Sequence, residues 1–199
     1  MSLKQFALVV ACLLILGGNT AWAEEGSFVF STEPIDPAAP KNLSTRFSAG
    51  DSIYGLIRVP RPWRALGKLR DNKLILAVYT TIDAKRLAAY MELRSDAQRN
   101  ATHLSFDVAP ALDKMTAYRD DGVFYGDAPG GIKKGACQIT QYLARLAPGK
   151  HVLTFWVLIA GKKLAHGEFT IEGRDFSGYQ LLHDQIKKSL SAGPVSYTH

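Results

Sequence analysis

The sequence contains few cysteines, and those it has cannot cross-link the folded chain. Cys12 and Cys137 are the two cysteines among 199 residues, and Cys12 lies in a segment expected to be removed. No intrachain disulfide is then possible, so stability must come from the packing of apolar side chains. A lone cysteine among apolar residues is typically a small buried hydrophobe, and pairing of Cys137 with another chain is the alternative.

Long apolar runs are also missing, apart from one near the N-terminus. Residues 6–16 are all apolar and follow the positive charge of Lys4, and Ala21–Trp22–Ala23 has the small-x-small pattern that signal peptidase reads. A run of this length is too short to span a bilayer, which takes about 20 residues. The pattern predicts a signal peptide over residues 1–23, cleaved near Ala23, and a periplasmic or secreted protein without a transmembrane span. A lipoprotein signal ending at Cys12 is the alternative.

Motifs for nucleophilic catalysis and for metal binding are missing as well. No histidine lies two to five residues from another or beside a cysteine, so no metal and no cofactor is predicted. Gly50–Asp51–Ser52 matches part of the GDS-type esterase motif, but Ser52 is expected to start a strand, and Gln180 replaces the aspartate needed three residues before His183. The sequence favours a non-enzymatic protein; the alternative is a small extracytoplasmic hydrolase or metal-dependent enzyme.

Two further sets of residues have the chemistry of a binding site. His151 and His166 fall in neighbouring predicted strands, between which a metal ion would fit. An acidic and aromatic segment has oxygen ligands for calcium and rings that stack on sugars: Tyr118, Asp120, Asp121, Phe124, Tyr125 and Asp127. Ordinary strand histidines and ordinary turn chemistry explain both sets more simply.

The remaining sequence is dominated by segments typical of β-strands. Residues 24–44 form a Pro-rich extended lead-in in which only 28–30 is expected to pair, as an edge strand, and residues 45–199 form one domain. The alternation of apolar and polar residues predicts strands over 52–59, 74–82, 86–94, 102–108, 152–160 and 164–172. Strand 74–82 is expected to be central and covered on both faces, and 86–94 is also compatible with a helix. Helices are predicted over 136–146 and 177–192.

The end of the domain carries a resemblance. Residues 146–155, a glycine turn at Gly161–Lys162 and the strand Gly167–Ile171 resemble the last corner and closing hairpin of immunoglobulin-like and fibronectin type III-like domains. His151 stands where many of these domains have a corner tyrosine. The resemblance covers about a third of the chain after residue 23. It implies a mainly β fold: an immunoglobulin-like antiparallel β-sandwich with a short helix before the closing hairpin and a C-terminal helix.

The strongest functional signal is a basic segment. The net charge is +6, and between residues 58 and 73 six Lys and Arg residues stand against one acid, Asp71. Pro60 and Pro62 hold this loop extended, so Trp63 would be presented between two arginines, as suits lipid headgroups or an acidic polymer. The alternative, which is the commoner case, is an ordinary solvated loop whose Trp63 packs into the edge of the core. The predicted binding residues are Arg58, Arg61, Trp63, Arg64, Lys68 and Arg70. Because export makes nucleic acid an unsuitable partner, the predicted partner of this binding or accessory module is an envelope protein or an anionic surface.

Overall fold

The computed structural model describes residues 25–71, 73–93, 95–115, 124–126, 132–134 and 137–191. Within them the chain is mainly β. The strands are β1 (Gly26–Ser31), β2 (Arg46–Ser48), β3 (Ile53–Arg58), β4 (Leu74–Ile82), β5 (Lys85–Leu93), β6 (His103–Ala109), β7 (Phe124–Gly126), β8 (Ile132–Lys134), β9 (Gly149–Ile159) and β10 (Lys162–Gly173). The helices are α2 (Asp96–Asn100), α3 (Cys137–Leu143) and α4 (Gly178–Ser191), with 3₁₀ turns η1 (Trp63–Ala65) and η2 (Leu112–Lys114).

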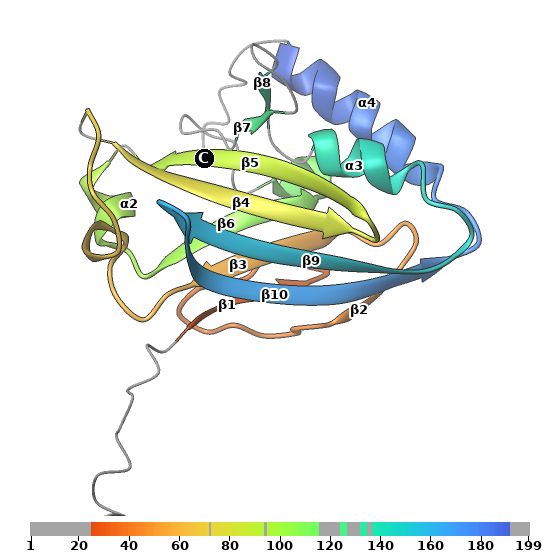
Figure 1. The fold of residues 1–199 in the computed structure, drawn as a ribbon. Helices are drawn as coiled ribbons and strands as arrows, with labels where there is room; N and C mark the ends of the chain where they lie inside the picture. The colour runs from red at the N-terminus through yellow and green to blue at the C-terminus, as the bar shows by residue number, and fades with distance from the viewer. Residues whose placement is uncertain are drawn as a thin grey trace, which may run out of the picture.

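The strands form one hydrogen-bonded path that curls into a half-barrel (Figure 1). Their order is β6-β3-β1-β10-β9-β4-β5-β7-β8, and β2 pairs separately with β10. The sheet is mixed rather than purely antiparallel, because β1 and β2 both run parallel to β10. The predicted mainly β class is therefore confirmed, whereas the pairing does not separate the strands into the two sheets of a sandwich.

Strand β1 lies inside the sheet, so the prediction of an edge strand at residues 28–30 is wrong. It pairs with β3 on one side and with the first part of β10 on the other. The close approach of β1 to β10 depends on Gly167, where any side chain would collide with the backbone of Phe28. The sequence predicted the strand but not its second neighbour: Phe28 and Phe30 are buried, and β1 pairs on two sides.

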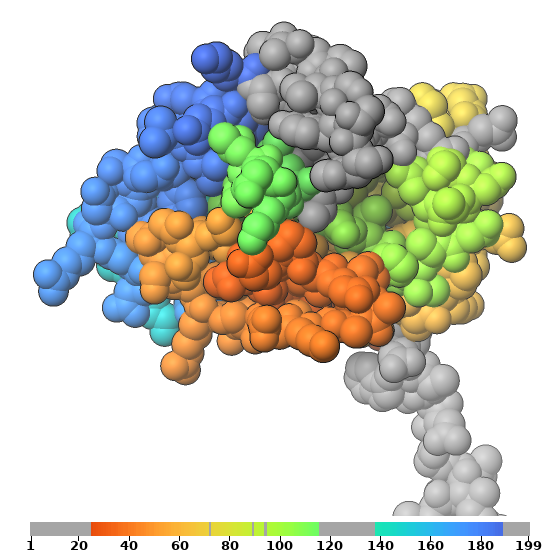
Figure 2. Space-filling view, turned by 180° about the vertical axis from the view of Figure 1, so that it is seen from behind, coloured from red at the N-terminus to blue at the C-terminus, as the bar shows by residue number. Residues whose placement is uncertain are grey.

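The segment between β1 and β2 is held against the domain rather than extended from it. Figure 2 shows this part of the chain, in orange, spread over one side of the molecule beside η2. Ser31 and Leu43 form a β-bridge. Lys114 makes a 2.8 Å ion pair with Glu33, across 81 residues of sequence. The Pro-rich lead-in is thus a closed surface loop over most of its length.

The concave side of the half-barrel encloses an aromatic core. Phe28 stacks on Phe30 with 4.8 Å between ring centroids, and Phe155 lies within 5.0 Å of both rings. Leu153, Phe155, Val157 and Ile159 alternate along β9 and are all buried. Burial of each such side chain stabilises the fold by about 1.5–3 kcal/mol. Packing of this kind stabilises the described part of the chain without a disulfide.

Helices α3 and α4 close one end of the half-barrel and join the same core. Ile139 and Leu143 of α3 and Tyr179 of α4 are buried in it, and the Tyr179 hydroxyl donates to the carbonyl oxygen of Asp51 at 2.9 Å. Both predicted helices are confirmed within a few residues. No helix among the described residues has the length and apolar character that crossing a membrane requires.

The closing hairpin is confirmed, and its turn lies one residue earlier than predicted. Ala160 and Gly161, with φ of 49° and 81°, join Ile159 to its partner Lys162. Positive φ at both positions is typical of a type I′ turn, whose twist matches that of the flanking strands. The segment that was compatible with strand or helix is a strand, β5, paired along its full length with β4.

Strand β4 is central in the sheet but is covered on one face only, contrary to the prediction. Its residues alternate between fully buried and partly exposed along the strand. On the convex face Ile75, Tyr90 and Val152 are 40%, 47% and 41% exposed. The apolar residues on both faces of β4 are explained by a convex surface that is itself partly apolar, which monomeric proteins commonly use for binding.

Candidate functional site

The predicted basic loop lies at one end of the half-barrel. β3 ends there at Arg58, which is opposite Ser27 at the start of β1, and the β9–β10 turn lies at the same end, on the left in Figure 1. The turn adds two lysines that sequence reasoning did not include. We call this surface the basic end, and its exposed cations are Arg58, Arg61, Arg64, Lys68, Arg70, Lys162 and Lys163.

The cations of the basic end are not neutralised by neighbouring acids. None of the seven makes an ion pair with any described residue. The acids nearby have other partners: Glu92 pairs with Lys73 at 3.4 Å, Asp96 with Arg99 at 2.9 Å, and Glu25 lies 3.8 Å from His166. Asp71 is the one acid within the loop itself. The basic end therefore presents seven exposed cations without an ion pair to a described acid.

Trp63 does not belong to this surface: the alternative in which it packs into the core is confirmed, and its presentation to a ligand is wrong. The side chain is fully buried, and its indole N–H donates to the carbonyl oxygen of His103 at 3.2 Å. The 3₁₀ turn after Pro62 rotates the indole inward, while Arg61 and Arg64 stay exposed. A tryptophan buries more apolar area than almost any other side chain, which outweighs the charge of its neighbours.

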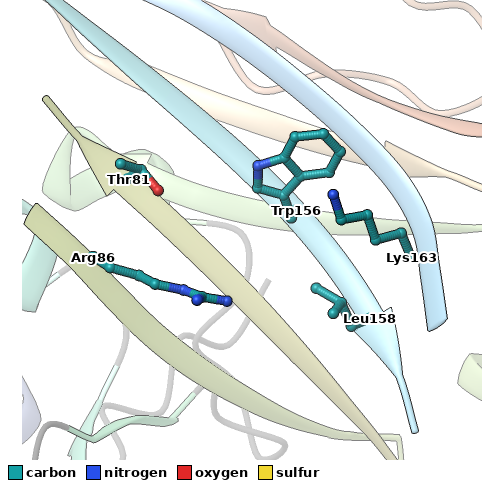
Figure 3. A pocket seen from close by; sticks show the side chains of 5 residues that line it. All are labelled: Thr81, Arg86, Trp156, Leu158 and Lys163. Atoms are coloured by element: carbon teal, nitrogen blue, oxygen red, sulfur yellow. The ribbon is translucent and has the colours of Figure 1, made fainter. Parts of the chain in front are cut away.

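A second candidate site lies on the convex face, and the sequence reasoning missed it. A hollow of about 280 Å³ is lined by residues of four strands: Thr81, Arg86, Trp156, Leu158 and Lys163. Figure 3 shows Arg86 and Lys163 pointing toward each other across the strands between them. Alternation along β9 does place Trp156 and Leu158 opposite the core, but only the pairing of the strands brings Arg86 to them.

The two cations of this hollow are held in place by aromatic rings. Tyr79 and Trp156 are direct cross-strand partners. The Arg86 guanidinium lies 4.0 Å from the centroid of the Tyr79 ring, and the Lys163 ammonium lies 3.9 Å from that of Trp156. Such cation–π contacts stabilise by about 0.5–1 kcal/mol at exposed sites. They orient both charges over the same aromatic pair.

His166 completes the aromatic row, and no acid is among the described residues that line the hollow. Its ring stacks on Trp156 at 5.0 Å between centroids, with 19° between the ring planes. The Arg86 and Lys163 side chains make no ion pair with a described residue. An arrangement of two oriented cations around a partly apolar floor is suited to an organic anion.

His151 has a structural role, in agreement with the simpler interpretation of the sequence and not with the alternative of a metal ligand. Its Nδ1 lies 2.7 Å from a carboxylate oxygen of Asp83, and its Nε2 lies 2.7 Å from the carbonyl oxygen of Ala147. Both neighbours are acceptors, and only the protonated ring donates from both nitrogens. Burial lowers the pKa of His151, but these two hydrogen bonds raise it by more than burial lowers it. The pKa of His151 is therefore above that of an ordinary histidine. His166 is opposite Trp156, which lies five residues after His151 on β9 and points to the other face of the sheet. The two histidines therefore cannot share a metal ion.

The remaining sequence candidates do not form a site in the described part of the chain. Gly50–Asp51–Ser52 builds the turn before β3, where the Asp51 carboxylate accepts the amide N–H of Ser48 at 2.7 Å. Asp120, Asp121 and Asp127 lie outside the described residues, and Cys137 is the first residue of α3. Within the described ranges no group of three or more His, Cys, Asp or Glu side chains is arranged around a possible metal ion.

The sequence matches no protein-family model, and no curated protein is significantly similar to it.

Proposed function

We propose that this protein is an exported, non-enzymatic binding module of the cell envelope whose basic end contacts an anionic lipid surface. The observation that carries the proposal is the gathering of seven exposed cations, without ion pairs to described residues, on one end of the half-barrel. The loop contributes five of them and the β9–β10 turn contributes two. Each cation close to an anionic membrane adds about 1 kcal/mol of attraction.

The position of the N-terminal strand supports the same orientation. β1 begins at Gly26, which pairs with Ala165 beside the β9–β10 turn. The described part of the chain therefore enters the sheet at the basic end. A membrane that holds the predicted signal segment during export would face the cations directly.

Co-sedimentation of the full chain with lipid vesicles tests the proposal. We expect binding to vesicles that contain phosphatidylglycerol to exceed binding to neutral phosphatidylcholine vesicles, and the difference to shrink as salt screens the charges. The double substitution Arg61→Glu with Arg64→Glu changes the charge of the basic end by four units. It should lower the partition coefficient for anionic vesicles at least tenfold, as expected from about 1 kcal/mol per charge.

A matched control changes the same charge at the opposite end of the domain. Arg145 and Arg174 are exposed, and they lie next to the start of β9 and the end of β10, away from the basic end. Arg145→Glu with Arg174→Glu should leave most of the preference for anionic vesicles intact. Equal losses in the two double variants would mean that net charge alone governs binding, and the proposed role of the basic end would be wrong.

We also propose the finer fold relationship, to immunoglobulin-like domains. It is supported by the closing hairpin and by the hydrogen bond from His151 back to the carbonyl oxygen of Ala147, four residues upstream. The corner tyrosine of immunoglobulin-like domains makes a similar bond to the backbone a few residues before it. Superposition of an experimental structure on immunoglobulin-like domains tests it. A match over the strands from β3 to β10 would support the relationship, and a match confined to the closing hairpin would contradict it.

A further inference from the structure

We infer that the hollow on the convex face binds a phosphate monoester carried on an apolar ring or short chain. This site is separate from the lipid contact proposed above, since of the seven cations of the basic end only Lys163 lines it. The occupant is deduced from the arrangement of charge, from the floor of the hollow and from its size.

The strand register directs both cations to one point. Arg86 is opposite Thr81 on β4. Its side chain leans along the sheet and covers Tyr79, which precedes Thr81 by two residues on the same strand. Lys163 is opposite Leu158 on β9, and it leans in the other direction to cover Trp156. Because Tyr79 and Trp156 are paired, the two charges approach the centre of the hollow from opposite sides (Figure 3).

The charge of the hollow suits a doubly negative group. Among its described lining residues two are cations and none is an acid. A phosphate monoester carries a charge between −1.5 and −2 at neutral pH and offers three acceptor oxygens. A guanidinium whose face rests on a tyrosine ring keeps its N–H edge available for two parallel hydrogen bonds to such a group.

The floor of the hollow suits an apolar body. Trp156 and Leu158 supply apolar surface, and the Thr81 hydroxyl supplies a polar group at the rim. The volume of about 280 Å³ is at the small end of the range for ligand sites, so it fits a single ring with its phosphate rather than a polymer. Inorganic phosphate would satisfy the cations but leave this apolar floor in contact with water.

Calorimetric titration of the full chain with phenyl phosphate tests the inference. We expect a Kd on the order of 0.1 to 1 mM, as is usual for a ligand of this size on an open site. Inorganic phosphate and phenol, which each supply one half of the ligand, should bind at least tenfold more weakly. Benzoate binding as tightly as phenyl phosphate would overturn the assignment of a doubly charged group.

Three substitutions locate the site. Arg86→Gln and Lys163→Gln should each weaken phenyl phosphate binding about tenfold, as expected for a hydrogen bond to a charged group. Lys162→Gln removes the same charge from the adjacent, exposed position and does not line the hollow, so it should change the Kd by less than twofold. An equal effect of Lys162→Gln would show that general electrostatic attraction, and not the hollow, accounts for the binding.

A spectroscopic measurement separates the hollow from other sites. The indole N–H signal of Trp156, assigned by its absence in Trp156→Phe, should shift on addition of phenyl phosphate, whereas that of buried Trp63 should not. Binding without a shift of the Trp156 signal would overturn the inference. Because this experiment contains no lipid, its failure leaves the vesicle proposal intact, and failure with vesicles leaves this one intact.

Discussion

Replacement of Trp63 distinguishes a core residue from a ligand-binding one. The indole is fully buried, and its N–H bonds to the carbonyl oxygen of His103. Trp63→Phe removes that hydrogen bond, which contributes about 1 kcal/mol, and the packing of one ring, which contributes about 1–2 kcal/mol more. We expect the free energy of unfolding to fall by about 2–3 kcal/mol. Trp63→Ala should cost about 3–5 kcal/mol, because the remaining cavity adds to the loss.

Urea unfolding followed by far-UV circular dichroism measures this change. With a slope of about 1–3 kcal/mol per M of urea, the Trp63→Phe midpoint should fall by about 1–2 M while the slope stays constant. The preference of the folded variant for anionic vesicles should match that of the unsubstituted chain. If the midpoint were unchanged and vesicle binding were lost, Trp63 would be exposed and the burial described above would be wrong.

Three further predictions concern stability. Asp83→Asn should lower the free energy of unfolding by about 0.5 kcal/mol at pH 5.5, because it removes an exposed partner of His151. Because the pKa of His151 is raised in the folded state, this contribution is fully present below about pH 6.5 and is lost as the pH rises through the folded-state pKa. Urea titrations at pH 5.5 and 8.5 should therefore show a smaller effect of the substitution at pH 8.5. A larger effect at pH 8.5 would contradict the assignment. Ala160→Asn should stabilise by about 0.5–1 kcal/mol in thermal unfolding, because Asn tolerates positive φ better than Ala; destabilisation would exclude the type I′ turn. Gly167→Val should destabilise by about 3 kcal/mol or more through collision with Phe28, and a wild-type melting temperature would refute the interior position of β1.

The local sequence pattern was sufficient to predict a structural element wherever the residues that form it are also neighbours in the sequence. β4 and the closing hairpin follow from alternation and a glycine turn, since strand side chains alternate with a period of two. α4 follows from apolar residues at helical spacing and from the Gly193–Pro194 stop. The clustering of basic residues after Arg58 follows from composition alone, because adjacent residues in an exposed loop stay close.

Tertiary structure decided what depends on residues that are distant in the sequence. The interior position of β1 arises from pairing with β10, about 140 residues away, and no local pattern encodes such a partner. The burial of Trp63 depends on α2 and β6, which provide its surroundings and its hydrogen-bond acceptor.

The hollow is the clearest case of this difference. No local sequence pattern marks Arg86, Trp156 or Lys163 as a binding residue. Alternation along β9 shows only that Trp156 faces away from the core. Their meeting depends on strand register, in which a shift of one residue would send each side chain to the other face. The sequence by itself determined the elements and the excess of positive charge, whereas the long-range pairing of strands determined which charges lie together, because register is set by the packing of the whole sheet.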